Sequence, residues 1–237
     1  MSEQKFENWP AVLADLSEGR DLDSKTAEAA LMSVLRGEAT DAQLAAFVVA
    51  LRQKGETVDE LSGLVRAMRF ACIPINCSPE TIDLVGAGGS QMGRKAALNV
   101  STIASFVAAG AGAKVCKHGN RKASSTSGSF DLLEELSIAA ELTPEQVSRC
   151  VEEVGVGFAY ARSFHPAMRH ASQVRMELGI PTVFNLLGPL SHPASLTRQV
   201  IGVPIEATGK RMAEVLKATG TELAMVVTGD GGLDELS

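Results

Sequence analysis

Two stretches of the sequence decide the fold: DLVGAGGS, at residues 83–90, and KHGNRKASSTSGS, at residues 117–129. Each places glycines and small hydroxyl side chains where a short apolar run ends. Glycine lets the backbone approach a ligand closely and adopt positive φ, and the amides at the start of a following helix attract anions. The two runs together predict loops at the ends of strands in an α/β protein.

The sequence between and after these runs alternates strand-like with helical segments. Apolar, β-branched runs end in glycine, and amphipathic segments follow them. We expect strands near 81–86, 113–117, 156–161, 198–204 and 222–230, and helices near 101–112, 130–138, 166–179 and 206–220. A further helix is expected to begin at Pro144, after the capping box of Thr143 and Gln146. This alternation is typical of an α/β fold with a mostly parallel central sheet, whose ligands bind beyond the carboxyl ends of the strands.

The first part of the chain is predicted to be a small helical domain. Ser24 can cap a helix that runs to Arg36, and Thr40 and Thr57 each open a capping box before an apolar periodic segment. The stretch FACIPINCSPE has two prolines and no periodicity, which indicates a linker. We therefore expect a helical domain over residues 1–75 and an α/β domain over residues 76–237, shortened at its C-terminal end.

Composition narrows the class of protein. The 237 residues are 45% hydrophobic and 21% charged, with a net charge of −6, which argues against a general binder of nucleic acid or membrane surfaces. The four cysteines form no CxxC pattern and are expected to be reduced and buried. With no signal-peptide pattern and no apolar run of membrane-spanning length, a cytoplasmic location is expected.

The polar residues around the two runs suggest a polyphosphate site. Asn99, Ser101 and Thr102 stand at a predicted helix start, and a basic group follows the next strand: Lys117, His118, Arg121 and Lys122. A purely structural origin stays open, because glycine turns and hydroxyl caps are common in α/β proteins. GAGG matches neither the dinucleotide-binding nor the Walker pattern.

A pair of adjacent carboxylates, Asp234 and Glu235, follows the last predicted strand in DGGLDE. Mg²⁺ binds through one or two carboxylates plus substrate phosphates, so the pair could hold this ion. The residues alone favour the alternative of a solvated acidic turn.

Four segments together resemble the anthranilate phosphoribosyltransferase family: NVST, KHGNRKASSTSGSFDLLEEL, HPAMRHASQVRMELGIPTVFNLLGPLSHPA and DGGLDELS. The family joins anthranilate to phosphoribosyl pyrophosphate. The resemblance extends from about Ser24 to the last residue. KHGNR is shared with pyrimidine nucleoside phosphorylases, whereas FNLLGPLSHPA is more particular to the anthranilate enzymes.

The resemblance implies a role for each matching residue, and implies Mg²⁺ as cofactor. Anthranilate would contact Gly86, Asn120 and Arg175, and Mg²⁺ would be held by Ser101, Asp234 and Glu235. Phosphoribosyl pyrophosphate would be bound by Gly86, Gly88, Gly89, Ser90, Asn99, Ser101, Thr102, Lys117, His118, Gly119, Asn120, Arg121, Ser124, Ser125 and Ser129. It also implies a homodimer formed through the helical domain.

The chain departs from the family pattern at several positions. Ser90 replaces the usual aspartate and Ala97 the usual threonine, which removes polar contacts to the sugar and phosphates. Arg162 and Gln173 stand where the family has prolines, which leaves the acceptor in question. Family members also continue well beyond GLDE, so we expect either a fragment or a naturally short form.

The implied reaction is displacement at the anomeric carbon by the amine of anthranilate, with pyrophosphate leaving. His118 is a candidate acid or base, although a structural or substrate-lining role is favoured because no partner carboxylate is evident. His165 and His170 are five residues apart on a predicted helix and share no metal-binding face. The alternatives are a nucleoside phosphorylase, another phosphoribosyltransferase, or a catalytically silent paralogue that binds nucleic acid or a partner.

Overall fold

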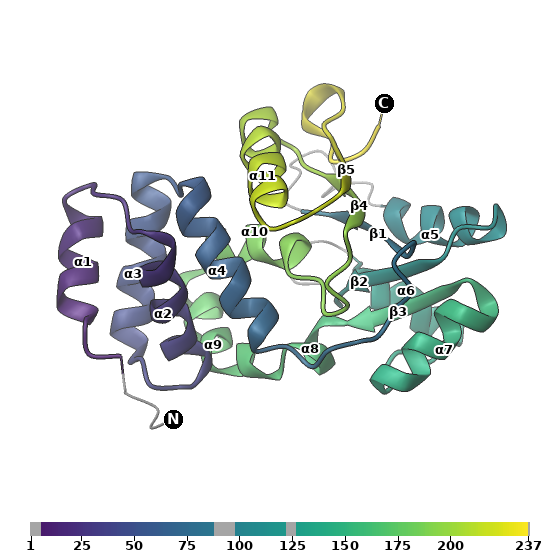
Figure 1. Ribbon diagram of the computed structural model, residues 1–237, viewed down its shortest axis with the longest axis horizontal. Coiled ribbons are helices and arrows are strands. Elements are labelled where there is room, and N and C mark those ends of the chain that lie inside the picture. The colour runs from purple at the N-terminus through teal and green to yellow at the C-terminus, as the bar shows by residue number, and fades with distance from the viewer. Residues whose placement is uncertain (1–5, 88–97, 122–126, 237) are drawn as a thin grey trace. The chain divides into compact units, whose positions relative to one another are not determined.

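A computed structural model describes residues 6–87, 98–121 and 127–236 (Figure 1). The chain divides into two compact units. Unit 1 comprises Met1–Cys72 and His165–Ser191, and unit 2 comprises Ile73–Phe164 and His192–Ser237. The predicted boundary at residue 75 assigned residues 165–191 to the α/β domain. In the structure this segment belongs to unit 1.

Unit 1 is helical. Its N-terminal segment forms α1 (Trp9–Ser17), α2 (Ser24–Leu35), α3 (Asp41–Lys54) and α4 (Val58–Phe70), and its second segment adds η1 (Pro166–Met168), α9 (Arg169–Leu178) and α10 (Val183–Leu190). The sequence predicted three N-terminal helices, and α1 was missed because no side chain caps its first turn. The helix expected to be capped by Ser24 is capped instead by Asp23, whose carboxylate accepts from the Thr26 amide.

The helices of unit 1 are held by close backbone approach and by two arginines. A Cβ on Gly63 of α4 would lie 2.0 Å from the Ser24 carbonyl oxygen at the start of α2, so only glycine fits there. The Arg52 guanidinium donates to the Pro181 carbonyl at 2.6 Å, and Arg69 donates to that of Leu190 at 3.0 Å. These two bonds connect α3 and α4 to the second segment.

Unit 2 is built on a five-stranded parallel sheet. Its strands are β1 (Ile82–Gly86), β2 (Val115–Gly119), β3 (Val156–Tyr160), β4 (Arg198–Gly202) and β5 (Leu223–Val227), in the order β3-β2-β1-β4-β5. The helices are α5 (Val100–Gly110), α6 (Ser129–Glu135), α7 (Pro144–Val154), α8 (Ala161–Phe164) and α11 (Glu206–Ala218), with η2 (Asp230–Gly232) after β5. The predicted fold class, a helical domain plus an α/β domain with a parallel sheet, is confirmed.

The strand order creates a switch point beside β1. From β1 the chain adds β2 and then β3 on one side, and it then crosses to place β4 on the other. In open α/β sheets ligands bind outside the carboxyl ends of the strands at such a reversal. The expected site in this protein is therefore the edge where β1 and β4 end.

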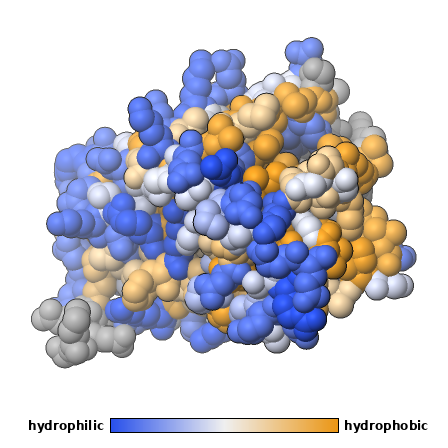
Figure 2. Space-filling model, turned by 45° about the vertical axis from the view of Figure 1, so that its right-hand side comes forward, coloured by the Kyte–Doolittle hydropathy of each residue, from blue (hydrophilic) through white to orange (hydrophobic). Residues whose placement is uncertain are grey.

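Apolar side chains remain exposed on unit 2, and Figure 2 shows hydrophobic residues gathered toward the right of the view. The edge strand β5 exposes Leu223 and Met225, and α5 exposes Ile103 and Val107. Among the helices that the structure describes, none combines the length and hydrophobicity needed to cross a lipid bilayer.

Candidate functional site

Three adjacent strands of unit 2 end in glycine at the same edge of the sheet. Gly86 ends β1, Gly119 ends β2 and Gly202 ends β4. Gly86 and Gly202 are register partners, and the Ala87 amide donates to the Gly202 carbonyl at 2.8 Å. The predicted glycine loop therefore begins at the switch point, although Gly88, Gly89 and Ser90 lie outside the described residues.

The acidic turn after β5 approaches the same edge. A Cβ on Gly202 would lie 1.6 Å from the Asp234 carbonyl oxygen, so the backbone of Asp234 lies directly against the end of β4. An antiparallel bridge between Gly229 and Leu233 closes this turn. Burial, and then the neighbouring Asp234 charge, raise the pKa of Glu235. The turn that carries the two carboxylates predicted to bind metal thus packs, through the Asp234 backbone, against the end of β4.

The oxygen ligands at this edge fit the chemistry of Mg²⁺. Mg²⁺ prefers oxygen ligands, and one or two carboxylates are enough when the phosphates of a substrate complete its coordination. In the described ranges no group of three or more His, Cys, Asp or Glu side chains gathers to hold an ion without such help. The site is therefore suited to Mg²⁺ that arrives with a phosphate ligand.

The start of α5 is connected to the loop after β2. Asn99 is the N-cap residue of α5, and its side-chain amide donates to the Ser127 hydroxyl at 3.0 Å. Ser101 is partly exposed in the first turn, where helix amides have no partner in the helix itself. Thr102 is fully buried, and none of the described residues bonds to its hydroxyl. The two loops predicted to bind phosphate are therefore close in space at this point.

The loop after β2 is packed tightly on the start of α6. The Ser129 hydroxyl donates to the Asn120 carbonyl at 3.2 Å, and it would lie 2.2 Å from a Cβ on Gly119. The Arg121 guanidinium lies 5.4 Å above the Tyr160 ring and pairs with Glu134 of α6. Asn120, Arg121 and Ser129 thus stabilise the loop itself, and Ser124 and Ser125 lie outside the described residues.

Lys117 and Asp83 are buried charges beneath this edge. Lys117 is 2% exposed, and its ammonium donates to the Leu84 carbonyl at 2.5 Å. Asp83 is 0% exposed, and one of its oxygens accepts from the His118 amide at 3.1 Å. Burial lowers the pKa of Lys117 to about 8 and raises that of Asp83 to about 6, and each charge partly offsets the shift of the other. Sequence reasoning missed Asp83, although a carboxylate inside an apolar strand is itself a signal.

His118 has a carboxylate nearby, as the sequence alone did not show, and Asp83 accepts a hydrogen bond from its backbone amide. The ring is 5% exposed and lies edge-on to that of His192, with centroids 5.6 Å apart. This arrangement agrees better with a lining or structural role than with acid–base catalysis.

His192 lies in a loop, as predicted, and its buried ring stabilises that loop. Its Nδ1 accepts from the Ala194 amide at 3.0 Å, and its Nε2 is 2.8 Å from the Cys116 carbonyl oxygen. Because an amide can only donate to Nδ1, Nε2 carries the proton and donates to Cys116. The ring ties the loop before β4 to the middle of β2.

We predict that nitrogen NMR at neutral pH will find the Nε2–H tautomer of His192. His192→Ala should lower the free energy of unfolding of unit 2 by about 1–3 kcal/mol, because it leaves the buried Cys116 carbonyl without a donor. An Nδ1–H tautomer, or an alanine variant of unchanged stability, would contradict this assignment.

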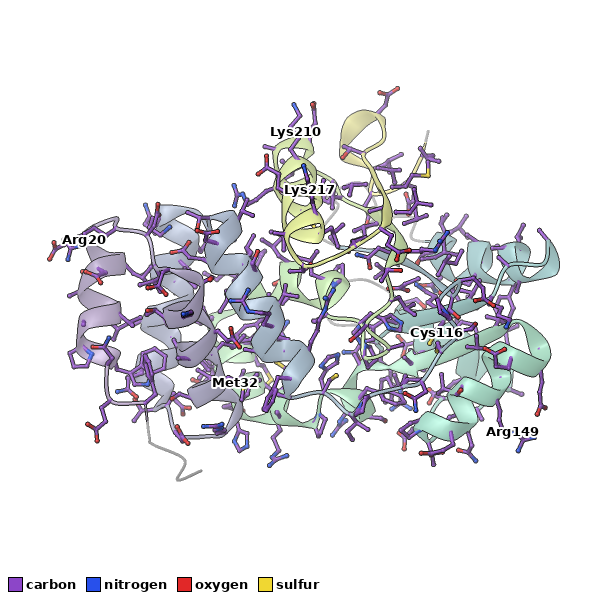
Figure 3. The ribbon with its side chains drawn as sticks, viewed as in Figure 1. Arg20, Met32, Cys116, Arg149, Lys210 and Lys217 are labelled. Atoms are coloured by element: carbon purple, nitrogen blue, oxygen red, sulfur yellow. The ribbon has the colours of Figure 1, made fainter. Side chains whose placement is uncertain are left out.

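The cysteines are free, as the sequence predicted, but of the four only Cys116 is fully buried. Cys116 is fully buried in β2, where Figure 3 labels it within the sheet, and Cys77 packs against the same apolar cluster. Their hydrogen bond lowers the pKa of the Cys77 thiol and raises that of Cys116. Cys72 and Cys150 are partly exposed.

Arg175 belongs to unit 1, whereas the other predicted site residues belong to unit 2. It is on α9 with its guanidinium 5.1 Å above the Phe184 ring of α10, and burial lowers its pKa.

His165 is the residue before η1 and does not lie within a helix, so the prediction that it shares one helix with His170 was wrong. Burial lowers the pKa of His165 to about 4.

Comparison with known proteins gives two matching family models. The glycosyl transferase family, a/b domain, matches residues 78–237, and the helical bundle domain of the same family matches residues 10–72. An anthranilate phosphoribosyltransferase of Arthrobacter sp. (strain FB24) is 47% identical over 97% of this chain and 64% of its own length. That of Nitrobacter hamburgensis is 47% identical over 98% of this chain and 68% of its own. The chain thus spans about two thirds of these relatives.

Solved structures agree with this relationship. The anthranilate phosphoribosyltransferase of Thermus thermophilus has a TM-score of 0.87 and 42% identity, over 95% of this chain and 67% of that one. The Saccharomyces cerevisiae enzyme in complex with phosphoribosyl pyrophosphate and Mg has a TM-score of 0.85 and 30% identity, over 98% and 68%. The yeast enzyme with 4-fluoroanthranilate has a TM-score of 0.81 and 27% identity, over 97% and 66%.

Proposed function

Because this chain belongs to the anthranilate phosphoribosyltransferase family, we propose that it transfers the phosphoribosyl group of phosphoribosyl pyrophosphate to anthranilate. The observation that carries the proposal is the shared edge of β1, β2 and β4, where three glycine-ended strands, the start of α5 and the Asp234 turn lie close together. An activated sugar with three phosphate groups requires many amide and hydroxyl donors at one place.

In the proposed reaction the anthranilate nitrogen forms a bond to the anomeric carbon. The bond from that carbon to the pyrophosphate oxygen breaks, and the amine nitrogen loses a proton to solvent. The amine of anthranilate is unprotonated at neutral pH, so no strong base is needed. Catalysis then rests on positioning and on stabilising the charge of the leaving group.

The residues of this chain supply those two contributions. The first amides of α5, with Asn99 and Ser101, would donate to the pyrophosphate, and the Lys117 ammonium would face the phosphoribosyl group. Gly86 and Gly119 would allow the sugar to lie close to the backbone. Asn120 would bind anthranilate. The family resemblance implies the same role for Arg175, which belongs to unit 1.

Ser101, Asp234 and Glu235 are the residues that would hold Mg²⁺. When bound, this ion neutralises developing charge on the phosphate oxygens. The yeast relative in complex with phosphoribosyl pyrophosphate and Mg supports the use of Mg²⁺.

A cytoplasmic location and a homodimer formed through unit 1 stay part of the proposal. Val49 and Phe70, exposed apolar residues of α3 and α4, support the dimer.

The test follows anthranilate fluorescence after phosphoribosyl pyrophosphate and Mg²⁺ are added to the chain. We expect the signal to fall as anthranilate is consumed, and to stay constant without Mg²⁺. A parallel assay with pyrimidine nucleosides and inorganic phosphate tests the superfamily alternative. Nucleoside cleavage without anthranilate consumption would overturn the proposed acceptor, and no turnover in either assay would overturn the enzyme assignment.

A further inference from the structure

The carboxylate of Asp83 lies inside the sheet, directly beneath the loops of the proposed site. It is the second residue of β1, and it is fully buried. One oxygen accepts from the His118 amide at 3.1 Å, while the other has no hydrogen-bond partner among the residues that the structure describes. A buried carboxylate with one unsatisfied oxygen is costly to the fold, so a role outside stability has to be considered.

The groups around Asp83 come from both neighbouring strands. On β2 these are Lys117, whose charge favours ionised Asp83, and the thiol of Cys116, whose pKa the Asp83 charge helps to raise. On β4 the register partner is Gln199, which is neutral and buried. The only cation that acts on Asp83 in the described part of the chain is therefore Lys117.

The positive charge of Lys117 in turn depends on the Asp83 carboxylate. A lysine with 2% exposure loses much of the hydration that stabilises its charge, and a nearby negative charge opposes that loss. The Leu84 carbonyl that accepts from its ammonium belongs to the residue after Asp83. One residue of β1 thus supplies negative charge, and the next supplies a hydrogen-bond acceptor.

We propose that Asp83 is a positioning residue of the phosphoribosyl site, which keeps Lys117 cationic and fixes the backbone at His118. The inference rests on the proposed function, because it concerns the same phosphate site. Asp83 acts from below the sheet edge, through Lys117 and the His118 amide. It needs no contact with the substrate.

This role predicts a specific pH dependence. Burial lowers the pKa of Lys117 to about 8, and removing the Asp83 charge lowers it further. An opposite charge at short range shifts a pKa by about one unit or more, and one unit is a tenfold change in the charged fraction. Asp83→Asn should therefore lose phosphate affinity at lower pH than the wild type does.

The experiment measures the dissociation constant of phosphoribosyl pyrophosphate with Mg²⁺, by calorimetry, from pH 6 to pH 9. We expect Asp83→Asn to bind nearly as well as the wild type at pH 6 and about tenfold more weakly near pH 8. Asp59→Asn, an exposed site in unit 1, is the matched control and should follow the wild type. An affinity loss of equal size at every pH would mean a merely structural role and would overturn the proposal.

A second variant background removes the titration of residue 117. Lys117→Arg replaces the ammonium with a guanidinium that stays charged throughout this range. We expect Asp83→Asn to cause no additional alkaline loss in that background. An additional loss of the same size would show that Asp83 acts on another group.

An NMR titration of the wild type keeps the inference testable if Asp83→Asn does not fold. In the ligand-free chain, the carbon NMR shift of Lys117 Cε should show two steps, its own near pH 8 and a smaller one near pH 6 as Asp83 titrates. A single step would overturn the inference. Failure of the wild type to bind phosphoribosyl pyrophosphate would instead overturn the proposed function and leave this titration as the independent test.

Discussion

Lys117→Met is expected to weaken the binding of phosphoribosyl pyrophosphate about 10- to 100-fold, the effect of removing a charged hydrogen bond. The variant should also lose about 1–3 kcal/mol of stability, because Asp83 remains buried without its cation. Binding is measured by calorimetry and stability by denaturant unfolding. Lys210→Met is the control, since Lys210 is exposed on α11, where Figure 3 labels it, and its ammonium pairs with Glu206 of the same helix.

The double variant Asp83→Asn/Lys117→Met separates folding from binding. Replacing two buried charges with neutral side chains of similar size often stabilises a protein by about 1–4 kcal/mol. We therefore expect the double variant to be at least as stable as the wild type at pH 7, and to bind phosphoribosyl pyrophosphate as weakly as Lys117→Met does. Recovered binding in this variant would contradict the role given to Lys117.

The pH dependence of stability gives a second readout on the same pair. The pKa of Asp83 rises from 3.8 to about 6 on folding, so its contribution to stability is complete below about 4 and is lost as pH rises through 6. The pKa of Lys117 falls from 10.5 to about 8, so its contribution is complete above 10.5 and is lost as pH falls through 8. The pair should therefore be least favourable to folding between pH 6 and 8, and the double variant should lack this minimum.

Gly202→Ala is expected to impair the metal site without replacing any proposed ligand, because it displaces the backbone of Asp234. The new Cβ would lie 1.6 Å from the Asp234 carbonyl oxygen and 2.7 Å from its carbon, and this backbone must move. A displacement of about 1 Å at a catalytic group can cost roughly 100-fold in rate. We therefore expect turnover to fall by about that factor, and the Mg²⁺ concentration for half-maximal rate to rise.

The matched control for this prediction is Gly110→Ala at the end of α5, where a Cβ would meet no atom within 4 Å. It should retain wild-type turnover and Mg²⁺ dependence. Equal activity in the two alanine variants would show that turnover does not depend on the contact between the Asp234 backbone and β4.

Local rules of sequence predicted much of this fold. The capping boxes at Thr40, Thr57 and Thr143 are all present, because each depends on only four consecutive residues. The helix α10 was missed because Gly188 and Pro189 lie inside it and suggest a loop. Its burial against other helices of unit 1 outweighs those local preferences.

The interactions that form the candidate site are not local, and they could not be predicted. Asp83 meets the His118 amide only because β1 and β2 pair in parallel at a fixed register. Gly202 lay inside a predicted strand, but its contact with Asp234 joins residues on either side of α11 and β5. The family resemblance predicted single site residues. Their hydrogen-bond and packing partners could be identified only from the folded structure.

The most direct test of the central claim is a calorimetric titration of the intact chain with phosphoribosyl pyrophosphate, with and without Mg²⁺. The strand-end site at Gly86, Lys117 and Gly202 predicts one saturable site per chain, strengthened by Mg²⁺ and greatly weakened in Lys117→Met. No heat and no thermal shift in the wild type, or equal affinity in the methionine variant, would contradict it.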